Sequence, residues 1–422
     1  MNAAILVPVL MFSGFFFVID FLLYRSLLRM NIKPNWLKLL KLALILVFLS
    51  SVLIFSYYFF NKEAQRYSLS RTYLSGIIFS IYLAKLFYVV LLLPQEIYYQ
   101  FKRIRSFFSR AAQKSTQKNA LDNGNTISRG AFIQKAALGV SVIPLYLSSR
   151  GVFADAYNYK VHYVPLFINN LPKELQGIKI IQMSDFHAGS LSDKDKVYEG
   201  IKQIKALQAD LFFFTGDMVN NFYWEADDYL EMLAEIRKPM GQFASLGNHD
   251  YGIYHNWSSE AEKQKNFEEI KGIHKKIGWQ LLNNAHEVIG LKGKKIGILG
   301  VENWGHSMRF PKLADLDLAK SGMQDVAVKL LLSHDPSHWD YKVLPNYSDI
   351  DVMFSGHTHG AQFGIENSFL KWSPAKYIYP QWAGIYQNKQ QQLYVNRGFG
   401  FIGYPGRIGI LPEISLFELK QG

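Results

Sequence analysis

Five short motifs in the second half of the chain carry residue types that hold divalent metal ions. They are Asp185-Phe186-His187, Gly216-Asp217, Gly247-Asn248-His249-Asp250, Ser333-His334 and Gly356-His357-Thr358-His359. Carboxylate oxygens and imidazole nitrogens suit Zn²⁺, Mn²⁺ and iron ions. Two cations held close together also need a shared anion, and such pairs activate water for displacement at phosphorus. The motifs therefore predict a two-metal hydrolytic site, with one histidine left over for chemistry.

The specificity of this prediction lies in the combination of motifs. Asp-x-His and Gly-Asp are common, and a single aspartate after a strand is more often a helix N-cap. The runs Gly247–Asp250 and Gly356–His359 are far more specific. All five motifs in this order are hard to explain as unrelated turn and capping residues.

Each of the five motifs follows one of six short β-rich runs that we expect to be buried strands. These runs are Ile178–Met183, Leu211–Phe214, Gln242–Leu246, Lys295–Leu299, Val328–Leu332 and Val352–Phe354. Helical patterns cover Lys194–Leu207, Trp224–Lys238 and Glu260–Ile277. Alternating strands and helices predict an α/β layered fold. Because parallel strands present their carboxyl ends at one edge of a sheet, the motif side chains should converge there.

Residues of about 175–420 resemble the calcineurin-like metallophosphoesterase superfamily, which shows the same motifs in the same order. The resemblance implies a four-layer αββα sandwich of two packed sheets flanked by helices. In this chain an all-α transmembrane region of three or four helices would precede it. The combination resembles a bacterial membrane-associated branch, whose members act on phosphodiesters or on nucleotide-linked diacylglucosamine.

The resemblance also assigns roles to the motif residues. The first of two divalent metal ions (Mn, Fe or Zn) would be held by Asp185, His187 and His359. The second would be held by Asn248, His334 and His357, with Asp217 bridging the two ions. His249 matches the non-ligand histidine that assists the leaving group, and Asp250 would orient its imidazole.

The first part of the chain has a different composition. The formal net charge is +12, yet residues 1–160 hold 19 lysines and arginines against five acids, and the remainder holds 27 against 29. This positive charge flanks apolar runs, which indicates a membrane surface as partner and no nucleic acid. There is no cysteine, which excludes disulfides and thiolate ligands.

Apolar runs of about 20 residues predict transmembrane helices in residues 1–95. The three runs are Ala3–Leu23, Leu42–Phe60 and Tyr73–Leu93. Residues 96–130 are expected to form a basic cytoplasmic linker, with an interfacial helix over Gln100–Lys114 as an alternative. A short fourth apolar segment, 131–150, is either a span or a signal-like segment, and the catalytic domain covers 155–422.

Loop charge predicts the orientation. The loops after the first and third runs are strongly basic and read as cytoplasmic, which places the N-terminus outside. A crossing by Ala136–Ser149 would put the catalytic domain outside the cytoplasm. We therefore expect a multi-pass protein of a bacterial inner membrane with an extracytoplasmic catalytic domain.

The predicted function is that of a membrane-anchored dinuclear-metal phosphoesterase. It would hydrolyse a phosphodiester or pyrophosphate, with a lipid-linked substrate favoured, by attack of a metal-bridging hydroxide while His249 assists the leaving group. One alternative is a phosphatase of soluble nucleotides or phosphomonoesters. The other is a non-enzymatic metal-dependent sensor or scaffold of a membrane complex.

For several polar residues the sequence leaves two interpretations. Contact with substrate or a place in a turn would explain His306, Asn220, Asn221 and Tyr251. A substrate phosphate or a structural ion pair would explain Arg397 and Arg407. The aromatic region after His359 would form either an apolar rim of the site or ordinary packing. In the membrane part, Asp20 and Lys85 snorkel or pair with each other. The remaining histidines are expected at the surface: His162, His255, His274, His286 and His338.

Overall fold

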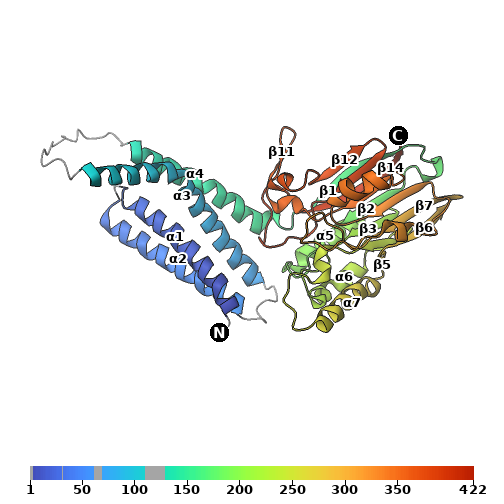
Figure 1. The fold of residues 1–422 in the computed structure, drawn as a ribbon, viewed down its shortest axis with the longest axis horizontal. Helices are drawn as coiled ribbons and strands as arrows, with labels where there is room; N and C mark the ends of the chain where they lie inside the picture. The colour runs from blue at the N-terminus through green and yellow to red at the C-terminus, as the bar shows by residue number, and fades with distance from the viewer. Residues whose placement is uncertain (1–2, 31, 61–68, 110–128) are drawn as a thin grey trace. The chain divides into compact units, whose positions relative to one another are not determined.

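The structure is a computed structural model that describes residues 3–30, 32–60, 69–109 and 129–422 (Figure 1). It divides into two compact units. One is a helical unit that ends at Arg150, and the other is an α/β unit over Gly151–Gly422, to which the described residues 69–72 are also assigned. Each unit is described by itself.

The helical unit contains α1 (Ala3–Leu27), α2 (Pro34–Phe60), α3 (Leu69–Ser109) and α4 (Arg129–Arg150). All four helices are long and apolar enough to cross a membrane. The three predicted runs lie within α1, α2 and α3. The fourth apolar run forms part of a 22-residue helix, which extends beyond the apolar run at both ends.

The predicted linker over 96–130 begins within a helix. Helix α3 continues through Ser109, and Pro94 lies inside it. The rest of the predicted linker, 110–128, lies outside the described residues.

The two charged residues of the predicted spans pair with each other. Lys85 Nζ donates to Asp20 Oδ1 at 2.7 Å, and the Tyr82 hydroxyl donates to Asp20 Oδ2 at 2.8 Å. A carboxylate in an apolar span needs such partners, because an unpaired charge there is costly. The pairing alternative is therefore confirmed, and it ties α1 to α3.

The α/β unit contains two six-stranded sheets. In spatial order the first sheet holds β1 (Lys160–Ile168), β14 (Glu413–Gln421), β2 (Lys179–Met183), β3 (Leu211–Thr215), β4 (Gln242–Ser245) and β5 (Gln280–Leu281). The second holds β12 (Gly384–Asn388), β13 (Gln391–Val395), β9 (Val352–Ser355), β8 (Val328–Leu332), β7 (Lys294–Gly300) and β6 (Ala285–Leu291). A separate hairpin pairs β10 (Ile365–Glu366) with β11 (Lys371–Trp372).

Side-chain alternation along the strands builds three apolar layers. Ile180 and Phe213 of the first sheet pack between the sheets against Ile298 and Phe354 of the second. The other face of the first sheet packs on α5 (Lys194–Ala206), α6 (Leu230–Ala234) and α7 (Glu260–Lys276).

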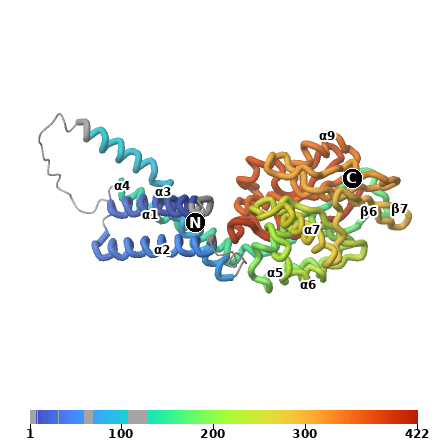
Figure 2. Tube along the Cα trace, turned by 60° about the horizontal axis from the view of Figure 1, so that its bottom comes forward, coloured from blue at the N-terminus to red at the C-terminus, as the bar shows by residue number. Residues whose placement is uncertain are grey.

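The outer face of the second sheet packs on α8 (Leu316–Lys320) and on the segment leading into α9 (Leu344–Asn346). Figure 2 places α9 on the opposite side of the unit from α5 and α6. The order of layers is therefore helix, sheet, sheet, helix, and the predicted αββα sandwich is confirmed.

All six predicted strands are present, each within one residue at either end. The helices expected over 194–207 and 260–277 also form. The helix expected over Trp224–Lys238 is wrong: Tyr223–Tyr229 is a 3₁₀ helix, and only Leu230–Ala234 is α-helical. Its aromatic and acidic residues, with no side-chain cap at the start, do not sustain a longer helix.

Candidate metal centre

The five motifs lie at the carboxyl ends of five strands. Asp185 follows β2, Asp217 follows β3, and Asn248 follows β4, and these three strands are parallel neighbours. His334 follows β8 and His357 follows β9 of the second sheet. The predicted ligands therefore reach one place from both sheets.

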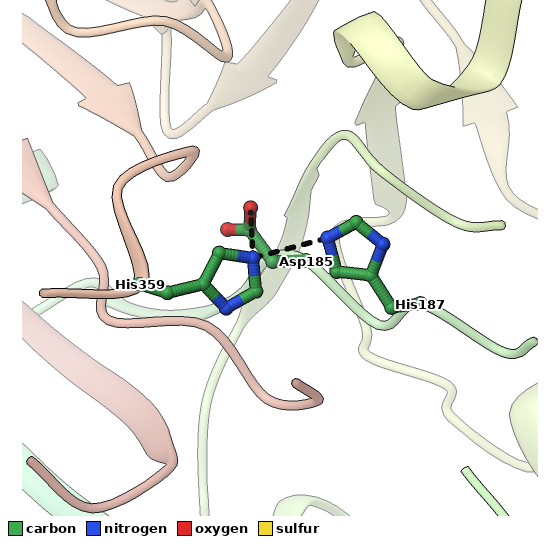
Figure 3. A group of neighbouring side chains, drawn as sticks. All are labelled: Asp185, His187 and His359. Carbon is green, nitrogen blue, oxygen red and sulfur yellow. Dashed lines mark hydrogen bonds and ion pairs between the residues drawn. The ribbon is translucent and has the colours of Figure 1, made fainter. Parts of the chain in front are cut away.

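One group contains Asp185, His187 and His359 (Figure 3). The Nε2 atoms of His187 and His359 lie 3.0 Å apart, and His359 Nε2 lies 3.3 Å from Asp185 Oδ1. One ligand atom from each residue lies within 4.8 Å of the others. This is the set that the sequence predicts for the first metal ion.

A second group contains Asp217, His334 and His357 within the same 4.8 Å limit. Asp217 Oδ2 lies 3.1 Å from His334 Nε2 and 3.5 Å from His187 Nε2, so this oxygen stands between the two groups. That position suits a carboxylate shared by two cations.

Asn248 adds a neutral oxygen to the second group. Its Oδ1 lies 2.7 Å from His357 Nδ1, while its Nδ2 donates to the Tyr254 hydroxyl at 2.8 Å. The bond to Tyr254 turns the carbonyl oxygen, the atom that binds metals, toward the cluster.

The backbone at these ligands is unusual. Asp185, His187, Asp217, His357 and His359 all have φ between 49° and 73°. Residues other than glycine rarely adopt this left-handed conformation, and such strain concentrates at functional sites. The strained loops therefore point to a role beyond connecting strands.

The charge of the cluster requires compensation. Asp185 and Asp217 are buried, and within the described part of the chain their ion-pair partners are histidines only. Burial would raise the pKa of Asp217, but His334 and His249 hold it well below its ordinary value. Burial would lower the pKa of His334, but Asp217 raises it to about 10.

Burial also lowers the pKa values of His187 and His357, which keeps both imidazoles neutral with a lone pair to share. Buried anions beside neutral imidazoles make a donor set for cations. The residues present thus fit two divalent ions.

His249 lies beside both groups, with a ring nitrogen within 4.8 Å of ligand atoms of His187 and Asp217. Its Nδ1 lies 2.8 Å from the backbone oxygen of Asn220. The prediction that Asp250 orients this imidazole is wrong. The Asp250 carboxylate accepts backbone N–H groups of Gly247, Asp217 and Met218 at 2.8–3.0 Å instead, because the 3₁₀ turn directs it beneath the loops.

Asn220, whose role the sequence left undecided, contacts two of the predicted site histidines. Besides its carbonyl contact with His249, its Oδ1 lies 3.0 Å from His187 Nδ1. The Asn220 backbone N–H donates to Glu225 at 2.5 Å, and burial raises the pKa of Glu225 to about 7. Asn220 therefore positions both His187 and His249. In the sequence, only its place three residues after Asp217 indicated that it lies near the site.

Aromatic side chains surround His357 and His249. The Tyr379 hydroxyl lies 2.7 Å from His357 Nε2, and the Phe310 ring meets His357 edge-on at 4.9 Å. Tyr254 packs on His249 with ring centroids 4.3 Å apart. Sequence reasoning missed these contacts, because they lie outside the motifs and no spacing rule marks them.

Two histidines predicted at the surface are buried. His274 lies among Phe214 and Trp279, and the Nδ1 of His338 lies 2.9 Å from the Ser333 hydroxyl. The prediction was wrong because polar residues adjoin His274 and His338 in the sequence, although the helical faces that carry them point inward. His162, His255 and His286 are half-buried, and His306 is exposed and stacks on Tyr341.

The two arginines are structural. Arg397 is buried between Glu366 and Glu413, and Arg407 donates to the carbonyl oxygens of Arg397 and Gly398 at 2.8 and 3.1 Å. The Tyr251 hydroxyl accepts the Asn303 backbone N–H at 3.1 Å, so it also serves the fold.

Two family descriptions match the chain. Residues 178–361 match "Calcineurin-like phosphoesterase". Residues 3–156 match "Probable Calcineurin-like phosphoesterase, transmembrane domain", which includes all four apolar helices.

Relatives come from animals and bacteria. A zebrafish (Danio rerio) transmembrane protein with metallophosphoesterase domain is 26% identical over 70% of this chain and 64% of its own length. The uncharacterized metallophosphoesterase YkuE of Bacillus subtilis is 28% identical over 60% of this chain and 82% of its own. The UDP-2,3-diacylglucosamine pyrophosphatase LpxG of Chlamydia muridarum is 26% identical over 54% and 81%. The chain thus spans slightly less than two thirds of the zebrafish relative.

Proposed function

We propose that this chain, which carries a calcineurin-like phosphoesterase domain and a transmembrane phosphoesterase domain, is a membrane-anchored two-metal hydrolase of phosphodiesters or pyrophosphates. The observation that carries the proposal is the meeting of buried carboxylates and imidazoles from both sheets, within 4.8 Å in each group. A donor set of this kind at strained loop backbones has no evident structural purpose.

We assign the first ion to Asp185, His187 and His359, and the second to Asn248, His334 and His357, with Asp217 shared. Two bound ions supply an activated water as nucleophile and neutralise charge that develops on the phosphoryl oxygens. Hydrogen bonds from the side of each ligand that faces away from the ions hold the side chains in orientation. One example is His334 Nδ1, which lies 2.7 Å from the Thr215 carbonyl oxygen.

His249 provides the proton for the leaving group. The Nδ1–H donates to the Asn220 carbonyl oxygen and leaves Nε2 for proton exchange, so the ring must be an imidazolium when it gives the Nε2 proton to the leaving group and is neutral afterwards. A positioned imidazole of this kind contributes roughly 10²–10⁴-fold to a rate.

The membrane part bears on the substrate. Four spans would return the chain to its starting side, and the basic loops after α1 and α3 support the proposal that this side lies outside the cytoplasm of a bacterial inner membrane. Nucleotide-linked precursors made in the cytoplasm would then be out of reach. We therefore favour a lipid-linked phosphodiester or pyrophosphate that carries no nucleotide, unlike the UDP-linked substrate named for the Chlamydia muridarum relative.

The test uses full-length protein in nanodiscs with bis-p-nitrophenyl phosphate and p-nitrophenyl phosphate, with and without Mn²⁺, Fe²⁺ or Zn²⁺. We expect metal-dependent cleavage that the Asp217→Ala variant loses together with metal binding. The preferred compound distinguishes diester from monoester chemistry. Two bound ions without turnover of these compounds or of lipid phosphoesters would instead support the sensor or scaffold alternative.

A further inference from the structure

The β10–β11 hairpin and the 3₁₀ turn after it, residues 363–379, form a segment that we call the apolar hairpin. Figure 1 shows β11 standing apart from the two sheets of the α/β unit. The hairpin pairs only two residues on each strand, Ile365–Glu366 with Lys371–Trp372. It contributes no strand to either sheet, so support of the sandwich does not explain it.

Large apolar side chains of the apolar hairpin face solvent. Phe369 is 97% exposed, Ile378 is 77% exposed and Tyr377 is 73% exposed. Phe363, Ile365 and Leu370 are exposed as well. Exposed apolar groups gathered on one short segment mark an interaction site rather than ordinary surface.

The composition of the segment suits a membrane interface. Residues 367–379 contain no acid, but they contain Trp372, two lysines and tyrosines at 377 and 379. The one acid of the strand pair, Glu366, is engaged by Arg397. Tryptophan and tyrosine collect at the bilayer surface, and lysine is attracted to anionic headgroups there.

The root of the apolar hairpin is bonded to the segment that holds the start of the α/β unit. The Gly364 backbone N–H donates to the Ile408 carbonyl oxygen at 2.9 Å, and the Arg407 N–H donates to the Gly151 carbonyl oxygen at 3.1 Å. Gly151 directly follows Arg150, the last residue of α4, and the candidate span runs to Asp155. The chain thus leaves a spanning helix and enters the α/β unit beside this root.

The other end of the apolar hairpin is bonded to the metal centre. The Ser373 hydroxyl donates to the Gly360 carbonyl oxygen at 2.7 Å, and the Tyr379 hydroxyl lies 2.7 Å from His357 Nε2. One short segment therefore links exposed apolar groups to a predicted metal ligand.

We propose that the apolar hairpin lies in the interface of the membrane that the chain's own helices span, with Phe369 and Ile378 among the acyl chains. The bilayer is the occupant that the observations favour, because a spanning helix ends where the hairpin root is held and the segment carries the residues typical of an interface. This position of the hairpin in the membrane does not depend on the proposed function. If the proposed function also holds, the site would act on phosphoesters in lipid headgroups.

The absence of cysteine permits a direct test. Full-length Phe369→Cys and Ile378→Cys variants, labelled with an environment-sensitive fluorophore, are placed in nanodiscs of phosphatidylcholine and phosphatidylglycerol with or without doxyl-labelled lipid. Leu318→Cys is the matched control, because Leu318 is 58% exposed and belongs to α8, which packs on the outer face of the second sheet. We expect doxyl lipid to quench the labels at 369 and 378 and to leave the label at 318 unchanged.

The proposal is overturned if the labels at 369 and 378 are quenched no more strongly than the label at 318. It is also overturned if these two positions are buried only in a contact between two copies of the chain, which cross-linking detects. Bound metal, measured in each variant, verifies that the domain is folded. The measurement needs no turnover. A chain that cleaves no phosphoester but shows the quenching therefore contradicts the proposed function and leaves the docking intact.

Discussion

His249 Nδ1 lies 2.8 Å from the backbone carbonyl oxygen of Asn220, a residue of the loop that follows β3. Because the Asn220 carbonyl belongs to the backbone, a side-chain substitution does not remove it. The orientation of the His249 imidazole therefore depends on the conformation of this loop. The same residue holds His187 through its side chain. The predicted proton donor and a predicted metal ligand thus share one support.

Replacing Asn220 should therefore weaken metal binding. Asn220→Ala removes the oxygen that faces His187 Nδ1, and loss of such a support typically costs roughly 10–100-fold in metal affinity or activity. Calorimetric titration of the metal-free protein with Mn²⁺ measures it. Asn221→Ala is the control, since the Asn221 side-chain oxygen has no hydrogen-bond partner among the described residues. Equal affinities for both variants would contradict the assignment.

His249→Ala should separate chemistry from metal binding. We expect both metals to remain and the rate to fall roughly 10²-fold or more with a poorly acidic leaving group. With p-nitrophenolate, which leaves without a proton, the loss should be much smaller. Turnover of an alkyl and a p-nitrophenyl phosphodiester by the same preparation tests this. An undiminished rate with the alkyl ester would rule out the role.

The Tyr379 hydroxyl should strengthen the second metal position. Tyr379→Phe removes the contact at His357 Nε2 and keeps the ring, so we expect roughly tenfold weaker binding of one metal ion without loss of fold. Metal content after dialysis against a graded chelator measures the effect. Tyr377→Phe, an exposed neighbour, should behave as the unsubstituted protein.

His274 should make stability depend on pH. Burial lowers its pKa to about 4, below the 6.5 of an exposed histidine, so the folded state resists protonation. Its contribution is complete above pH 6.5 and is lost as pH falls toward 4, by at most on the order of 3 kcal/mol. Urea unfolding at pH 7.5 and 4.5 should show a smaller decrease in His274→Phe than in the exposed-site control His306→Phe. Equal decreases would exclude His274 as the cause.

The proposed orientation is testable with single cysteines. In intact cells a membrane-impermeant maleimide should label Leu318→Cys in the α/β unit. It should not label Lys33→Cys between α1 and α2 until the membrane is permeabilised. The reverse pattern would place the catalytic domain in the cytoplasm and restore nucleotide-linked lipids as candidate substrates.

Strand positions were predictable because the core is regular. Buried runs such as Leu211–Phe214 alternate between two apolar layers, and strand periodicity marks them directly. The two-residue strands β5, β10 and β11 carry no such signal. The helix expected at Trp224–Lys238 is only partly formed although the segment holds good helix formers, because tertiary context can override such a preference.

The sequence by itself determined which residues could meet. Motifs at the ends of parallel strands lie at one edge of their own sheet, so the convergence of Asp185, Asp217 and Asn248 was predictable from the sequence. Their meeting with His334 and His357 depends on how the two sheets pack. Only the tertiary structure decided what each side chain faces. The left-handed backbone at Asp217 and the turn at Asn248–Tyr251 direct the Asp250 carboxylate to backbone amides. They also bring the His249 ring to the Asn220 carbonyl oxygen. Such contacts join residues through loop conformation, which depends on the packing of the whole domain rather than on local pattern.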